Sequence, residues 1–136
     1  MNEAQISDKA RLLSRLREQL LNVATSQAEN NKNQALRILF KRMERMSDDM
    51  VFKTLRKLSE IGAVDITAAT ETLAPAGRTP MDSIQQVLGL LRGGSPPRPT
   101  SNPVKDTGYV LEALEHFARY FRDKALHQIE RGREDG

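Results

Sequence analysis

The stretch KRMERMSDDMVFKTLRKLSEIG, residues 41–62, predicts two helices separated by a short polar break. Ser47, Asp48 and Asp49 form the break, and their side chains favour the N-cap and first turn of a new helix. Apolar residues recur at three-residue steps beyond the break, and Gly62 follows the last of them, as in a left-handed helix C-cap. The stretch therefore predicts a helix, a tight connection and a second helix with a defined end.

Apolar residues at helical spacing extend this pattern along most of the chain. The expected helices cover residues 7–28 (capped by Ser7), 34–46, 48–61, 80–92 and 109–131, with a turn at 29–33, a short extended piece at 63–66 and a short helix at 67–73. Their apolar faces are Ala10, Leu13, Leu16, Leu20 and Val23; Leu36, Leu39, Phe40, Met43 and Met46; Val51, Phe52, Leu55, Leu58 and Ile61; Ile84, Val87, Leu88 and Leu91; and Val110, Leu114, Phe117, Phe121 and Ala125.

Length and composition favour one small helical domain. The chain has 136 residues, 4 % aromatic residues and no tryptophan, so a Leu- and Ala-rich helical core is expected. Residues 93–108 contain four of the six prolines and three of the eight glycines, which predicts a linker. We therefore expect an all-α fold: a small helical bundle over residues 5–92 with a helix-turn-helix-like pair, then the linker 93–108, then an amphipathic helix over 109–131.

Sequence features exclude several kinds of chemistry. Cysteine is absent, which excludes disulfides, thiol catalysis and Cys-based zinc sites, and no P-loop or Gly-x-Ser-x-Gly motif is present. His116 and His127 each follow an acid by four residues, which predicts local pairing rather than a metal site. We expect no enzyme activity, no cofactor and no metal. No signal peptide or membrane-spanning stretch is evident, so we expect no membrane partner and a cytoplasmic location, in the host cytoplasm if the protein is viral.

Positive charge is concentrated in one part of the chain. Residues 32–57 carry eight Lys or Arg against three acids, whereas the chain as a whole has a net charge of +3. Such concentration favours a nucleic acid or an acidic protein surface as partner. The predicted nucleic-acid-binding residues are the bases beside the apolar faces of the two central helices: Lys41, Arg42, Arg45, Lys53, Arg56 and Lys57. The acidic start of the second of these helices favours contact with phosphates over sequence-specific contact with nucleobases. The alternative is a solvated basic face without a partner.

The last expected helix has two interpretations. Its apolar face could dock on a protein partner or on a second copy of the chain. The predicted partner-binding residues are Leu114, Phe117, Phe121 and Ala125. Alternatively, the helix folds back onto its own bundle.

Residues 35–66, ALRILFKRMERMSDDMVFKTLRKLSEIGAVDI, resemble the N-terminal helical region of small terminase subunits of tailed phages. The resemblance implies a homo-oligomeric ring that recognises viral DNA and presents it to an ATP-driven, nucleolytic large subunit. It also implies phosphate contacts by Lys53, Arg56 and Lys57. The acidic helix start and the long proline-rich linker depart from the pattern. KTLRKLSEIGAVDI is also similar to part of winged-helix regulators, without the scaffold helix that precedes it in that fold.

Two functional hypotheses follow from the sequence. The first is a non-enzymatic, oligomeric nucleic-acid-binding protein, with DNA as partner, that acts in phage DNA packaging. The second is a helical adaptor or scaffold that binds protein through its C-terminal helix.

Overall fold

The computed structural model describes residues 3–66 and 103–135, with side chains described for 8–66 and 107–124. The regular elements of these residues are all α-helices: α1 (Glu3–Asn30), α2 (Gln34–Met43), α3 (Asp48–Glu60) and α6 (Pro103–Asp135). The predicted all-α class is confirmed. The helices expected over 67–73 and 80–92, and the linker up to residue 102, lie outside the described residues.

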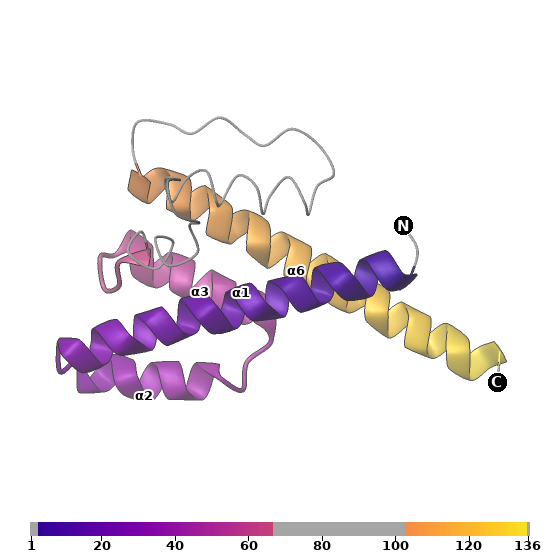
Figure 1. Ribbon diagram of the computed structural model, residues 1–136, viewed down its shortest axis with the longest axis horizontal. Coiled ribbons are helices and arrows are strands. Elements are labelled where there is room, and N and C mark those ends of the chain that lie inside the picture. Colours follow the sequence, from indigo (N-terminus) through magenta and orange to yellow (C-terminus); the bar gives the residue numbers. More distant parts are fainter. Residues whose placement is uncertain (1–2, 67–102, 136) are drawn as a thin grey trace.

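The four helices form a bundle centred on α1, which packs against each of the other three (Figure 1). Taken in chain order, the four described helices run in alternating directions along the bundle. The last helix, α6, packs most extensively along α3 and also crosses α1. The helices α1, α3 and α6 therefore all pack against one another, whereas α2 packs mainly on α1.

One continuous apolar core lies between the helices. Its largest fully buried side chains are Phe40, Phe52, Phe121, Leu13, Met43, Leu55, Ile66, Leu111 and Val51. These residues come from all four helices and from the segment after α3, so the predicted apolar faces meet inside one chain. Burial of this apolar surface is the main force that holds the bundle together.

The connection between α1 and α2 is a turn at residues 31–33, shorter than the turn expected at 29–33 because α1 continues to Asn30. Lys32 has a φ of +53°, and Asn33 is the N-cap of α2, where its side chain accepts a hydrogen bond from the amide of Leu36 at 3.1 Å. The predicted start of the first helix at Ser7 was wrong, because α1 begins at Glu3. Glu3, Ala4 and Gln5 are good helix formers, so the helix extends from Ser7 toward the N-terminus.

The end of α2 also differs from the prediction. The helix stops at Met43 instead of Met46. The next turn is closed by hydrogen bonds between residues three apart, as in a 3₁₀ turn: the amide of Arg45 donates to the carbonyl of Arg42 at 3.2 Å, and the amide of Met46 donates to the carbonyl of Met43 at 3.0 Å. Tightening of the last turn in this way is common where helical carbonyls find partners elsewhere.

The end of α3 is a Schellman motif at the predicted glycine. Gly62 has a φ of +75°, the amide of Ala63 donates to the carbonyl of Leu58 at 2.9 Å, and the amide of Gly62 donates to Ser59 at 3.1 Å. Ile61 was expected on the apolar face, but it is 76 % exposed because it lies at the C-cap, beyond the part of α3 that packs.

The segment after α3 is joined to α1 by a pair of hydrogen bonds from one side chain and by burial of its own apolar residues. Gln27 of α1 donates to the backbone carbonyl of Asp65 at 2.8 Å and accepts from the amide of Asp65 at 3.0 Å. Val64 and Ile66 on either side are buried. Residues 63–66 form no strand; instead they anchor the chain on α1.

The last helix begins earlier than predicted. It starts at Pro103 instead of Tyr109, so the final part of the expected linker is helical. Proline is tolerated in the first turn of a helix, where its missing N–H has no intrahelical partner to lose. None of the helices in the described ranges has the length and apolarity required to cross a membrane.

Candidate nucleic-acid interface

The predicted bases of α2 lie on its outer side. Lys41 and Arg42 belong to the last turn of α2 and Arg45 to the turn that follows, and all three side chains are exposed. On the opposite side, Phe40 and Met43 are fully buried in the core. Among the described side chains, none forms an ion pair with any of these three bases. The outer face of α2 therefore presents basic side chains that form no ion pair with the described residues.

Two further residues share this outer face. Arg37 precedes Lys41 by four residues and is also exposed, with a hydrogen bond to Gln34 at 3.2 Å. The four-residue spacing of 37, 41 and 45 was the sequence feature that indicates a common row, although Arg37 was not predicted as a site residue. Ile38 is 51 % exposed between these bases.

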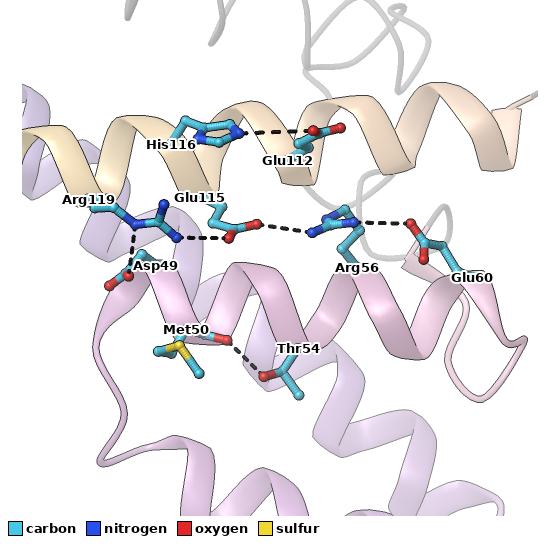
Figure 2. Close-up of polar contacts among 9 residues, drawn as sticks. All are labelled: Asp49, Met50, Thr54, Arg56, Glu60, Glu112, Glu115, His116 and Arg119. Carbon is cyan, nitrogen blue, oxygen red and sulfur yellow. Dashed lines mark hydrogen bonds and ion pairs between the residues drawn. The ribbon is translucent and has the colours of Figure 1, made fainter.

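On α3, Lys53 and Lys57 lie on the side that faces away from the core. They are four residues apart, Lys53 is half-buried and Lys57 is exposed, and neither has an ion-pair partner in the described residues. The same side carries Met50, whose carbonyl accepts a hydrogen bond from the Thr54 hydroxyl at 2.8 Å (Figure 2). Five basic side chains without an ion-pair partner in the described residues are named the unpaired bases below, a term that refers to amino-acid side chains and not to nucleobases. They are Lys41, Arg42, Arg45, Lys53 and Lys57.

Arg56 differs from its neighbour Lys57, because its side chain points toward α6 (Figure 2). Its guanidinium lies 3.3 Å from Glu60 of α3 and 3.3 Å from Glu115 of α6. Burial by itself lowers the pKa of Arg56, but hydrogen bonds and charge attraction from Glu115 and Glu60 outweigh it, and the pKa is raised. The structure thus places Arg56 in the helix interface and away from the unpaired bases.

The contact of Arg56 is one link of a longer series of ion pairs between α3 and α6, named the α3–α6 ion-pair chain. Its members are Glu60, Arg56, Glu115, Arg119, Asp49 and Arg122. Arg119 donates to Glu115 at 3.1 Å and lies 3.7 Å from Asp49, and Arg122 donates to Asp49 at 2.7 Å (Figure 2 shows all but Arg122). Asp49 and Glu115 are each 5 % exposed. Both buried acids are therefore fully paired, as charges in a protein interior must be.

The acidic start of α3 is occupied by the bundle itself. Asp48 lies 3.3 Å from the Nε of Arg17 on α1 and accepts a hydrogen bond from the Ser14 hydroxyl at 2.8 Å. Ser47 takes the predicted N-cap position, but its side chain makes no capping hydrogen bond. With Asp49 paired to α6, the first turn of α3 lies between α1 and α6. A recognition helix contacts nucleobases with an exposed N-terminal end, and α3 does not present such an end.

The predicted docking face of the last helix is covered within the chain. Leu114 and Phe121 are 3 % and 1 % exposed in the common core, and Phe117 is half-buried with its ring stacked on Phe121 at 6.3 Å between centroids. The side chain of Ala125 lies outside the described residues. Of the two interpretations of this helix, the structure shows the fold-back onto its own bundle.

An open cleft of about 300 Å³ lies where the start of α3 meets α1 and α6. Its wall includes Leu13 and Phe121, and its polar rim includes Asp48, Asp49 and Arg122, which already form the ion pairs described above. The described side chains contain no group of three potential metal ligands. His116 pairs with Glu112 at 3.9 Å, as its spacing predicted.

Arg17 is the residue that the sequence did not indicate. Its guanidinium donates to the carbonyls of Met43, Glu44 and Met46 at 3.1, 2.7 and 3.1 Å, in addition to its ion pair with Asp48. Its position on the edge of the apolar face of α1 was a hint that it points inward. Its partners follow from how the helices pack.

No protein-family model matches the sequence, and neither a curated protein nor a solved structure is similar to it.

Proposed function

We propose that this protein binds the phosphate backbone of nucleic acid, without enzymatic activity, through the unpaired bases. The observation that carries the proposal is their contrast with the arginines of the α3–α6 ion-pair chain. Arg56, Arg119 and Arg122 are all ion-paired within the chain, whereas Lys41, Arg42, Arg45, Lys53 and Lys57 have no acidic partner among the described residues. Cations without intramolecular partners are available to neutralise phosphates and release the counterions bound to them.

The aromatic residues favour a duplex over a single strand. Proteins that bind single-stranded nucleic acid stack its nucleobases on exposed aromatic side chains. Phe40 of α2 and Phe52 of α3 are completely buried, and the exposed tyrosines Tyr109 and Tyr120 belong to α6. The described faces that bear the unpaired bases therefore offer charge without a stacking platform. This supports contact with the backbone of a duplex, with DNA as the first candidate.

The resemblance to small terminase subunits extends the proposal to an oligomeric DNA-recognition subunit in phage DNA packaging. The oligomeric part is tested by light scattering, which should give a mass several times that of one chain. The rival function, a protein-binding adaptor that uses the apolar face of the last helix, has less support because Leu114 and Phe121 are already in the core.

The binding proposal is tested by fluorescence anisotropy of a labelled duplex titrated with the protein between about 50 and 200 mM salt. Five phosphate contacts predict that log K falls with log salt with a slope of about −4.5. The double variant Lys53→Glu/Lys57→Glu should bind far more weakly at about 50 mM salt, and its salt slope should be shallower by about 2. The matched control is Arg11→Glu/Arg15→Glu, an exposed pair at the same spacing on α1 with the same change in charge.

Two results would contradict the proposal. One is absence of duplex binding by the wild type at about 50 mM salt, where the phosphate contribution is strong. The other is an equal loss of affinity in the two double variants, which would show that only net charge matters.

A further inference from the structure

Arg17 connects three helices at the place where the basic region changes from α2 to α3. It lies on α1 with its side chain 18 % exposed. The two N–H groups of its Nη2 are shared among the carbonyls of Met43, Glu44 and Met46, at the end of α2 and in the turn that follows. Met43 and Glu44 are the last residue and the C-cap of α2, and a cation at this end of a helix interacts favourably with the helix dipole.

The same guanidinium holds the start of α3. Its Nε lies 3.3 Å from Asp48, the first residue of α3, whose other oxygen accepts from Ser14 at 2.8 Å. Arg17 and Ser14 of α1 thus both contact the beginning of α3, and Arg17 also donates hydrogen bonds to the end of α2. The planar guanidinium of arginine can serve both sides at once, which a lysine ammonium cannot do in the same geometry.

The unpaired bases stand on either side of this junction. Arg42 and Arg45 border the carbonyls that Arg17 binds, and Lys53 lies further along the helix that Asp48 begins. Because α2 packs mainly on α1 and not along α3, the relative placement of the two sets of bases is fixed through α1. Arg17 is the polar contact that joins both sets to that helix.

We infer that Arg17 is a positioning residue for duplex binding, which sets the spacing of the bases on α2 and α3 without touching the nucleic acid itself. This inference rests on the proposed function. Simultaneous contact with several phosphates requires the bases to be held at a suitable spacing, and preorganisation reduces the ordering cost of binding. Loss of Arg17 should therefore reduce the number of phosphates contacted at one time.

The test uses Arg17→Lys, which keeps the charge, with Arg15→Lys as control on the exposed side of the same helix. For Arg17→Lys we expect a dissociation constant about five times higher at about 50 mM salt and a salt slope shallower by about 1, the value for one phosphate contact. Arg15→Lys should match the wild type in both. Since net charge is unchanged in both variants, a change in slope reports geometry. Circular dichroism verifies that helix content is retained.

Ser14→Ala is the second variant, because Ser14 is exposed and the substitution removes only its hydrogen bond to Asp48 and leaves the apolar core intact. It should shift affinity and slope in the same direction as Arg17→Lys, by a smaller amount. If the wild type binds with a steep salt slope but Arg17→Lys and Ser14→Ala behave like Arg15→Lys, the positioning role is overturned and the proposed function stands. If the wild type binds no duplex, both are overturned.

Discussion

The α3–α6 interface and the outer face of α2 are both rich in arginine and lysine, yet they use these residues in opposite ways. In the interface, Arg56, Arg119 and Arg122 alternate with the buried acids Asp49 and Glu115. On α2, Lys41 and Arg42 face solvent without an acidic partner among the described side chains.

This difference teaches that local charge density does not identify a binding surface. Arg56 and Lys57 are adjacent in the sequence, but successive residues of a helix point about 100° apart. That rotation directs Arg56 toward α6 and leaves Lys57 exposed. What distinguishes the two regions is whether a neighbouring helix supplies the acid, and substitutions can test this distinction directly.

The largest effect on stability is expected from Glu115→Ala in the interface. The substitution leaves Arg56 and Arg119 without their shared buried partner. Breaking a fully buried pair costs 3–5 kcal/mol, and both arginines are partly hydrated here, so we expect the free energy of unfolding to fall by about 2–3 kcal/mol. Urea denaturation followed by circular dichroism measures it.

The control for Glu115→Ala is Glu112→Ala, which removes an exposed acid of the same helix that pairs only with His116 among the described residues. Exposed pairs of this kind contribute about 0.5 kcal/mol or less. Equal losses in the two variants would mean that the ion-pair chain stabilises the interface no more than an exposed pair does.

A smaller effect is expected from the neighbouring pair Arg56→Met and Lys57→Met, which exchange the same charge for an apolar chain. Arg56→Met should lower the free energy of unfolding by about 1–1.5 kcal/mol, because Glu115 keeps only one of its partners. Lys57→Met should cost about 0.5 kcal/mol or less. Duplex affinity should change in the opposite order, with the greater loss in Lys57→Met.

The outcome that contradicts this division of roles is a loss of duplex binding in Arg56→Met that exceeds the loss in Lys57→Met while both variants remain folded. Alkaline pH offers no substitute for the substitution. Because the pKa of Arg56 is raised on folding, its contribution is present below the pKa of the unfolded chain and is lost only as the pH rises through the folded value, above the ordinary range of arginine.

Much of the fold could be predicted from the sequence, because helical spacing of apolar residues and local end signals carry it. The turn that ends at Asn33 and the C-cap at Gly62 depend on their own side chains or backbone; the turn falls within the predicted range 29–33, and the C-cap is at the predicted residue. The end of α2 could not be predicted, since it depends on Arg17 of another helix. The start of α6 was missed because proline and glycine in residues 103–108 were read as linker residues, although a proline fits the first turn of a helix.

The candidate site was predictable only in part, for a related reason. The exposure of Lys41 and Lys57 follows from their distance to the apolar stripes on their own helices. Arg56 follows the buried Phe52 by four residues, and Glu115 follows the buried Leu111 by four, so both lie against the core of their helices. Such charged residues are candidates for interhelical ion pairs. Which residues pair depends on how α3 and α6 are aligned, and the sequence of one helix does not contain that information.

The smallest expected effect compares the N-caps of the two helices that bear the unpaired bases. Asn33 accepts a hydrogen bond from the amide of Leu36, whereas Ser47 makes no capping bond and α3 is held instead by Asp48 and Asp49. Asn33→Ala should therefore lower the free energy of unfolding by about 1 kcal/mol, and Ser47→Ala by a few tenths. Urea denaturation of the two variants measures both.

A larger loss in Ser47→Ala than in Asn33→Ala would contradict the contrast between the two regions. It would show that α3 depends on its own cap and not on the ion pairs that α1 and α6 supply. The expected order has a physical basis in helix length. With only the residues Gln34–Met43, α2 is too short to be stable alone, so it relies on a local cap at one end, Arg17 at the other and the burial of Phe40 and Met43 between them. Its outer face takes no part in packing against the other described helices, so the basic side chains there form no ion pair with any of them.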